Sequence, residues 1–263
     1  MRVTVLSENT VCREGLSPEH GLSLYLETGA HRILFDMGQS DLFLKHAALL
    51  GVDIAAVDVA VLSHGHYDHG GGLAAFLAAN RHARVYVNQN AFGAHCRGDG
   101  SYIGLDSALS ASERLCPVGE RYEIDDTLSL FACNGREMPY GLDTVGLCVR
   151  AGDRLVAEDF RHEQYLLIRE GERRILISGC AHKGVLNLAE WFAPDVLIGG
   201  FHLSKYPTEG EGAAALDRIA ARLSAGRTAY YTCHCTGERQ YSYLRQKMGD
   251  RLQYLACGAI VEV

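Results

Sequence analysis

The sequence predicts a mixed α/β fold in which two sheets pack face to face with helices outside, a four-layer αββα sandwich. Apolar, β-branched runs typical of strands are interspersed with helical runs, and the order strand, strand, helix, strand occurs in both halves of the chain. Each half also leads its strands into histidine-containing loops. The 263 residues are 48% hydrophobic, enough for a sizeable core, and we expect one domain, 1–263.

The first half begins with a predicted three-stranded meander that turns at Gly29-Ala30. The next helix has Ser40 as its candidate cap and Gly51 as its stop, and His46 is expected on its solvent face. The predicted strands and helices of this half, in order, cover residues 2–6, 22–28, 31–36, 41–50, 57–62, 73–79 and 83–87.

Residues 88–130 contain several glycines and Pro117, and their apolar periodicity fades. An irregular stretch of this length predicts a lid or substrate-binding insertion, with an oligomer contact as the alternative. His95 and Cys96 lie in it, and we interpret them as structural or merely exposed rather than as metal ligands.

The second half begins with a predicted hairpin of two strands joined across Glu170-Gly171-Glu172. Helices and strands then alternate, and the chain closes with an edge strand. The predicted elements cover residues 164–168, 173–177, 185–192, 195–200, 213–223, 228–233, 238–248 and 252–263.

The strongest functional signal is the stretch 63–72, which holds three imidazoles and a carboxylate within six positions. Neutral imidazole nitrogen is a good ligand for divalent zinc, iron or manganese. His64 and His66 can direct two rings at one ion, and Asp68 and His69 can serve a second. A polar turn rich in histidine by chance is the alternative, but the ligand density and glycine-rich exit favour a metal site.

Two later strand ends carry further candidates. His182 follows the strand at 173–177, and we predict a metal ligand there rather than a capping or core residue. Cys180 has two open interpretations, a thiolate ligand or a buried core cysteine. Lys183 precedes a helix opened by Gly184 and could bind an anionic group, with ordinary turn chemistry as the alternative. His202 is either a proton donor or substrate contact, or a satisfied histidine near the core.

These motifs resemble the metallo-β-lactamase superfamily, whose signature His-x-His-x-Asp-His follows a strand. Further matches resemble the branch of 7,8-dihydropterin-6-methyl-4-(β-D-ribofuranosyl)aminobenzene-5'-phosphate synthase-like metal-dependent hydrolases. They lie at residues 19–23, 34–40, 178–184, 199–203 and 233–237, so the resemblance covers the whole chain. The resemblance implies the metallo-β-lactamase fold, and the division into two halves rests on it because no sequence repeat is visible.

The resemblance also implies roles for individual residues. Asp36 would hydrogen-bond the histidine loop without touching metal. His234 would be the final metal histidine, so that the loops of His64, His182 and His234 converge. Glu19 and His20 would approach the metals, although an ordinary polar loop also explains them.

One departure from the family pattern leaves the metals open. The usual pattern has a histidine and then a bridging carboxylate on separate strands, whereas here Cys180 and His182 occur together. We expect zinc, one or two ions, with manganese, iron and magnesium as alternatives. Cys233 and Cys235 are expected to pack on the face opposite His234.

Charge and cysteine content restrict the function classes. A net charge of −7 argues against a nucleic-acid binder. Nine cysteines without Cys-x-x-Cys pairs argue against a disulfide framework and suit a reducing cytosol. No apolar run is long enough for a signal peptide or membrane span, so we expect a cytoplasmic protein without membrane partners.

The predicted function is metal-dependent hydrolysis of a small anionic ester, phosphoester or lactone. A divalent ion lowers the pKa of bound water from ~15.7 towards ~7, and Asp68 could hold or orient that water. The alternative is a pterin-phosphate transferase using the same site. A diiron oxidoreductase is disfavoured because position 66 is His rather than Glu, and a non-catalytic protein because all ligands are present. An RNA-processing nuclease is disfavoured by the acidic charge. A homo-oligomer remains open.

Overall fold

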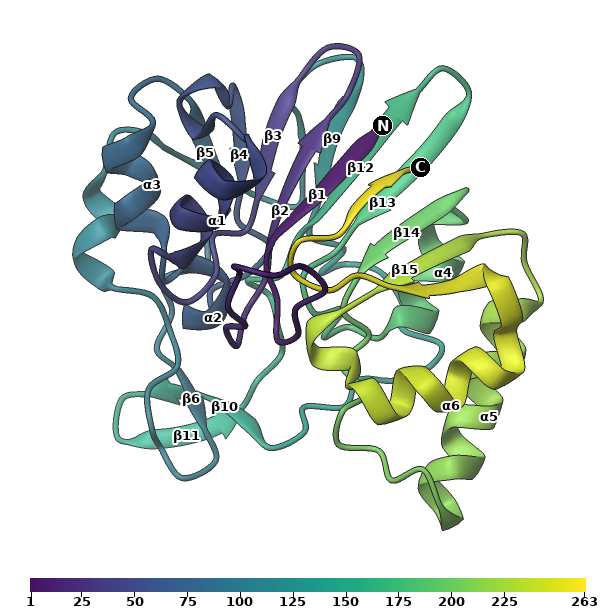
Figure 1. Ribbon diagram of the computed structural model, residues 1–263. Helices are drawn as coiled ribbons and strands as arrows, with labels where there is room; N and C mark the ends of the chain where they lie inside the picture. The colour runs from purple at the N-terminus through teal and green to yellow at the C-terminus, as the bar shows by residue number, and fades with distance from the viewer.

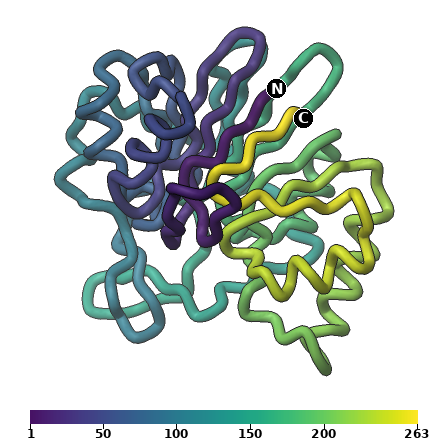
Figure 2. The backbone as a smooth tube through the Cα atoms, viewed as in Figure 1, coloured from purple at the N-terminus to yellow at the C-terminus, as the bar shows by residue number.

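The computed structural model describes residues 1–263 and shows two seven-stranded sheets packed face to face, with helices on both outer faces (Figure 1). This is the predicted αββα architecture. The two ends of the chain lie side by side (Figure 2), where the Met1 ammonium donates to the Val263 carbonyl at 3.0 Å. No helix combines the length and apolar character needed to cross a bilayer.

The first sheet has the order β17-β1-β2-β3-β4-β5-β7. Its β17-β1-β2-β3 part is antiparallel and its β3-β4-β5-β7 part is parallel. The strands are β1 (Arg2–Ser7), β2 (Ser23–Glu27), β3 (Arg32–Phe35), β4 (Val59–Val61), β5 (Arg84–Asn88), β7 (Leu115–Val118) and β17 (Ile260–Glu262).

The second sheet has the order β16-β15-β14-β13-β12-β9-β8. Strands β13 to β16 are parallel, and β13-β12-β9-β8 are antiparallel. The strands are β8 (Arg121–Glu123), β9 (Leu128–Phe131), β12 (Tyr165–Glu170), β13 (Arg173–Ile177), β14 (Val196–Gly199), β15 (Ala229–Thr232) and β16 (Leu252–Tyr254).

Helices cover the outer face of each sheet (Figure 1). Helices α1 (Leu42–Leu50) and α3 (Leu73–Ala79) pack on the first sheet, and α4 (Val185–Phe192), α5 (Gly210–Ser224) and α6 (Glu238–Met248) on the second. Helix α2 (Tyr67–Gly70) is a single turn. Short 3-10 helices occur at Ile54–Ala56, Ser107–Ala111, His234–Thr236 and Gly249–Arg251.

Three apolar clusters hold the layers together. The central one lies between the sheets, where side chains such as Val5 and Leu24 of the first sheet meet Leu166 and Ile177 of the second. The other two lie between each sheet and its helices. Burial of this apolar surface is the dominant stabilising term, and it fixes which strand ends lie at the same edge.

Three local predictions differ from the structure. Residues 115–131 belong to the main sheets, so 88–130 is not one insertion. The extra element is a small sheet of β6 (His95–Arg97), β10 (Leu147–Ala151) and β11 (Arg154–Ala157). The closing segment 252–263 forms two strands in different sheets rather than one. His46 is buried, with its Nδ1 2.7 Å from the Leu6 carbonyl, because Phe43 and Ala47 place the same face of α1 against the sheet.

Candidate metal centre

The histidine loop begins where β4 ends and runs into α2, at the edge where parallel strands of both sheets finish. Close packing fixes its path. A Cβ on Gly71 would lie 2.2 Å from the Gln39 carbonyl oxygen and 2.6 Å from the Tyr67 carbonyl oxygen, so only glycine fits there. The glycines at the end of the histidine motif therefore allow the loop to pack closely against the backbone around Gln39.

One ligand group consists of His64, His66 and His182, all buried and with ligand atoms within 4.8 Å of one another. The Nε2 atoms of His64 and His182 are 3.4 Å apart. His182 follows β13 of the second sheet, so the site joins the two sheets. The structure thus brings the pair His64 and His66 together with His182, the ligand predicted on a separate loop.

A second group consists of Asp68, His69 and His234. The His69 and His234 Nε2 atoms are 3.2 Å apart, and Asp68 Oδ2 lies 3.8 Å and 3.3 Å from them. His234 Nδ1 is 2.8 Å from Asn9 Oδ1, which fixes its ring from behind. These are two imidazoles and a carboxylate, a donor set that suits a divalent ion.

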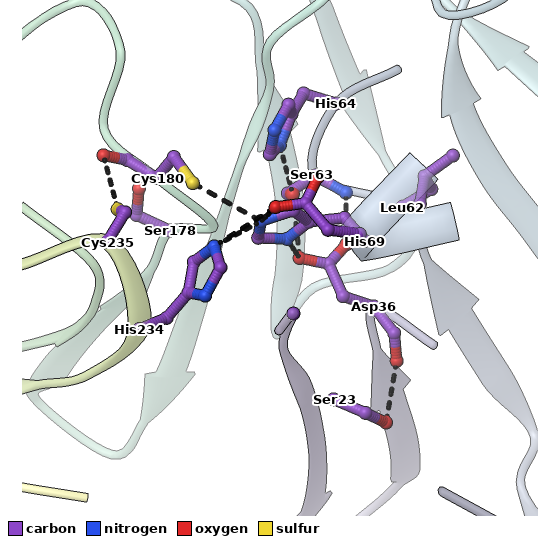
Figure 3. A network of polar contacts seen from close by, with 12 residues as sticks. Ser23, Asp36, Leu62, Ser63, His64, His69, Ser178, Cys180, His234 and Cys235 are labelled. Carbon is purple, nitrogen blue, oxygen red and sulfur yellow. Dashed lines mark hydrogen bonds and ion pairs between the residues drawn. The ribbon is translucent and has the colours of Figure 1, made fainter. Parts of the chain in front are cut away.

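Cys180 adjoins both groups, and Figure 3 shows its sulfur directed towards His69. Its Sγ is 3.2 Å from His69 Nε2, and it also forms a possible metal group with His64. Cys235 Sγ contacts the Cys180 carbonyl at 3.6 Å, so Cys235 lies at the site. The expectation that it packs on the opposite face is wrong, because β15 ends at Thr232 and His234–Thr236 is a 3-10 turn. Cys233 does pack in the central core.

Asp36 connects the histidine loop to the first sheet, as Figure 3 shows. Its Oδ1 accepts from the Ser63 amide at 2.7 Å, and its Oδ2 accepts from Ser63 Oγ at 2.7 Å and His69 Nδ1 at 2.6 Å. The last contact fixes the His69 tautomer and leaves Nε2 free for the second ligand group. The arrangement matches the predicted role of Asp36.

Backbone strain is concentrated around the site. Asp36, Ala181, His202 and His234 all have φ between 49° and 59°, in the left-handed region that non-glycine residues rarely adopt. Each such residue costs of order 1–3 kcal/mol and persists only where the surroundings hold it. The neighbouring sheets therefore impose this geometry on the site.

The histidines of the site differ in their charge in the absence of an ion. Burial lowers the pKa of His66 to about 3 and the pKa of His64 and His182 well below the ordinary value, so these rings are neutral and keep a lone pair. Burial acts the same way on His69, but Asp36 and Asp68 outweigh it and raise its pKa to about 9. Without an ion, His69 is therefore protonated at neutral pH.

Binding of an ion by the second ligand group, Asp68, His69 and His234, is expected to release about one proton at pH 7.5. With a pKa of about 9, His69 is protonated at this pH and must lose that proton to coordinate the ion. Because the pKa of His69 is raised, protons compete with the metal ion for this ring below pH 9. The affinity of this group for the ion should therefore decrease about tenfold for each pH unit below 9. Calorimetry in buffers of different ionisation enthalpy measures the release. Asp36→Asn should reduce it, and an unchanged value would contradict the assignment.

Cobalt substitution tests whether Cys180 is a ligand. Burial raises the pKa of its thiol well above the ordinary value, so only an adjacent cation would make the thiolate stable. We expect the Co²⁺-loaded protein to show a sulfur-to-cobalt charge-transfer band that Cys180→Ser removes and Cys116→Ser leaves unchanged. A band lost in Cys235→Ser instead would assign the ligand to Cys235.

His20 lies at the site, and Glu19 does not. His20 Nε2 is 3.3 Å from Asp68 Oδ2, and its side chain is half exposed at the pocket. The Glu19 carboxylate accepts from Ser7 Oγ, the Gln39 amide and Ser40 Oγ. It holds the loop after β3, and nothing in its contacts gives it a catalytic part.

Lys183 is fully buried and does not face the pocket, so the predicted anion-binding role is wrong. Its Nζ donates to the Ala132 and Glu163 carbonyls at 3.0 Å and 3.2 Å. Glu163, which sequence reasoning missed, accepts from the His182 amide at 2.8 Å and the Lys183 amide at 3.0 Å. Its part is to hold the loop that carries His182.

The ligand groups open into a pocket of about 320 Å³, a size typical for a small molecule. His202 lies in its wall with its ring centroid 4.3 Å from that of His182. Burial alone would lower the pKa of His202, but Cys235 beside it raises the pKa above the ordinary value. Arg97 and Lys205 also line the pocket and supply the positive charge that Lys183 does not.

Sequence reasoning also missed Phe160 and a group made by His95, Glu158 and His162. The Phe160 ring stacks on His182 at 4.3 Å between centroids and 6° between planes. Glu158 and His162 are four residues apart, a signal that was available, but no spacing connects them to His95. Of the two interpretations given to His95, structural or merely exposed, the structure shows a buried residue whose Nδ1 lies 2.7 Å from Glu158 Oε2.

Known proteins resemble this chain in sequence and in fold. A family model described as metallo-beta-lactamase superfamily matches residues 16–114. An uncharacterized protein of Methanocaldococcus jannaschii is 30% identical over 253 residues, 93% of this chain and 94% of the relative. The 7,8-dihydropterin-6-methyl-4-(beta-D-ribofuranosyl)-aminobenzene-5'-phosphate synthase of the same organism is 24% identical over 276 residues, 93% of this chain and 90% of the enzyme.

Among solved structures, a metal-dependent hydrolase of the beta-lactamase superfamily superposes with a TM-score of 0.83 at 28% identity, covering 100% of this chain and 99% of that one. Zn(2+)-bound PqqB from Methylobacterium extorquens superposes with a TM-score of 0.59 at 14% identity, covering 100% of both chains. The second likeness concerns the fold alone.

Proposed function

Because the chain belongs to the metallo-beta-lactamase superfamily, we propose that it is a metal-dependent hydrolase of small anionic esters, phosphoesters or lactones. One observation carries the proposal. Two groups of three ligands, His64-His66-His182 and Asp68-His69-His234, adjoin Cys180, and members of both groups line one pocket. The superfamily binds divalent metals, and we propose zinc, as one or two ions.

The residues present fit such ions. The first group offers three buried neutral imidazoles, and the second adds a carboxylate, which partly balances the ionic charge. When bound, divalent ions supply Lewis acidity and lower the pKa of a coordinated water from ~15.7 towards ~7.

The chain's own side chains would position the reactants and handle protons. Asp68 Oδ2 faces the pocket beside His20 and His234, where it can hold the attacking water by a hydrogen bond. His202 is the candidate proton donor to the leaving group, since its raised pKa favours the protonated ring. The substrate would lie between these two residues.

Positive charge at the pocket supports an anionic substrate. Lys205→Ala and Arg97→Ala are each expected to raise KM about tenfold with little change in kcat, because a hydrogen bond to a charged group contributes about 1.5–3 kcal/mol. Lys45→Ala, an exposed lysine on α1, is the control. Kinetics on an anionic ester and a neutral analogue measure the effect, and equal losses on both would contradict an anion contact.

The experiment that tests the function starts with elemental analysis of protein purified without added metal. An activity screen over phosphodiesters, lactones and phosphorylated pterins follows. Hydrolysis in ¹⁸O-labelled water should place one labelled oxygen in the product. Metal-loaded protein that turns over none of these substrates would reject the proposal.

The second candidate is a pterin-phosphate transferase. The observation that favours it is the 24% identity to the synthase over 93% of this chain. The labelling experiment separates the two candidates, because transfer to an organic acceptor leaves solvent oxygen out of the joined product.

A further inference from the structure

A further cluster of polar side chains, distinct from the two ligand groups, adjoins His66 on the side away from the pocket. It comprises His66, His95, Glu158 and His162, all buried, with one ring nitrogen or carboxylate oxygen of each within 4.8 Å of the others. His95 begins β6, and Glu158 follows β11, so both come from the small third sheet. His162 precedes β12. The metal loop therefore meets two distant segments here, β6 and the connection from β11 to β12.

Three ring nitrogens in this group are buried without a hydrogen-bond partner, the Nε2 atoms of His66, His95 and His162. An unsatisfied buried donor or acceptor costs about 1–3 kcal/mol, and three in one group are far from the usual pattern. Either a small rearrangement pairs them with one another or an ion occupies the space between them.

The partners of the other ring nitrogens fix two tautomers. His162 Nδ1 accepts from the Gly65 amide at 2.8 Å, so a neutral His162 carries its proton on Nε2. His95 Nδ1 faces Glu158 Oε2 at 2.7 Å, and a carboxylate only accepts, so a neutral His95 donates from Nδ1 and keeps a lone pair on Nε2. The remaining carboxylate oxygen, Oε1, accepts from the Phe160 amide at 3.1 Å.

The tautomer of His66 decides how many hydrogen-bond donors and acceptors the cluster has. Its Nε2 is buried, so Nδ1 is the nitrogen left to face the pocket that His66 lines. A ring that coordinates through Nδ1 carries its proton on Nε2. The group then has two unpaired donors, His66 Nε2–H and His162 Nε2–H. It has two acceptors, His95 Nε2 and the free lone pair of Glu158 Oε2, which is 3.7 Å from His162 Nε2.

This balance favours hydrogen bonds over an ion. An ion bound by His162 Nε2 would need a lone pair there while Nδ1 still accepts from Gly65, which requires a doubly deprotonated ring. Pairing the donors and acceptors requires only small shifts, since one ligand atom of each residue already lies within 4.8 Å of the others and His162 Nε2 is 3.7 Å from Glu158 Oε2.

We propose that His95, Glu158 and His162 are positioning residues that hold His66 by its Nε2–H and so direct its Nδ1 at the metal. The proposal rests on the proposed function only in treating His66 as a metal ligand. Outer partners of metal-bound histidines typically contribute 10–100-fold to metal affinity. Through this group, the third sheet supports the metal centre.

Two substitutions of His95 distinguish the roles of its two ring nitrogens. His95→Asn keeps a donor near the Nδ1 position and deletes the acceptor, whereas His95→Gln places an amide group near the Nε2 position. We expect His95→Asn and His95→Phe to lower Co²⁺ affinity about 10–100-fold and to change the visible spectrum of the Co²⁺-loaded full chain. His95→Gln should recover much of both. His82→Asn, at an exposed histidine, is the matched control.

Long-range ¹H–¹⁵N spectra of the wild-type imidazoles test the proposal even if the variants fail to fold. We expect His66 and His162 protonated on Nε2 and His95 on Nδ1, and the opposite tautomer of His95 would overturn the proposal. Wild-type affinity and spectrum in His95→Asn and His95→Phe would also overturn it. A metal content one ion higher in wild type than in His95→Phe at saturating Co²⁺ would show an ion site instead. None of these measurements needs turnover, so a missing activity would count only against the proposed function.

Discussion

His66→Ala is expected to abolish hydrolysis and to remove bound metal. The ring supplies one of three imidazoles in the His64-His66-His182 group, and alanine offers no donor atom. The loss should exceed the about 10–100-fold that removal of an outer partner costs. Elemental analysis and kcat/KM on the same preparation measure both effects.

The control for this change is His82→Ala, which removes an exposed imidazole and should leave metal content and kcat/KM at wild-type levels. Circular dichroism of both variants checks that the fold is intact. Full turnover by a His66→Ala protein with an empty site would reject the proposed mechanism.

Asp36→Asn is expected to cause the largest loss of stability among single changes at the site. Asparagine tolerates the φ of 59° at this position, so the backbone is unaffected. Its single oxygen cannot accept from Ser63 and His69 on both sides, and its NH₂ group would face a donor. The free energy of unfolding should fall by about 3 kcal/mol, and metal affinity about 10–100-fold.

Asp58→Asn is the matched control because Asp58 is exposed. It accepts from the Arg32 amide at 3.1 Å and faces His31 Nδ1 at 3.0 Å. Its effect should stay below about 1 kcal/mol. Urea denaturation of the metal-free proteins gives both values, and equal losses in the two variants would contradict the role assigned to Asp36.

The sequence allowed prediction of the features whose signal is local. His64, His66, Asp68 and His69 lie within six positions, and each strand before a ligand is a compact apolar run. The layered fold follows from the order of these runs and the family resemblance. The role of Asp36 came from the resemblance alone, since no spacing rule connects it to Ser63 and His69.

The remaining site features depend on tertiary packing. His95 and Glu158 are separated by 63 residues and meet only because β6 and β10 pair. Lys183 has the sequence context of an anion site, but the loop before α4 turns its side chain inward to the Ala132 carbonyl. For His46 a local signal existed, since Phe43 and Ala47 at helical spacing place it on the buried face.

The ligand groups join parts of the chain that are far apart in sequence, since His182 lies 118 positions after His64 and His234 lies 165 positions after His69. Coordination would therefore act as a removable crosslink between the two halves of the sandwich, because closing such long loops costs substantial chain entropy. Stripping the ions with a chelator should make the halves separate more readily at this end. Protease resistance and the rate of global unfolding would then depend on metal supply, and the cell's free metal concentration would set the lifetime of the protein.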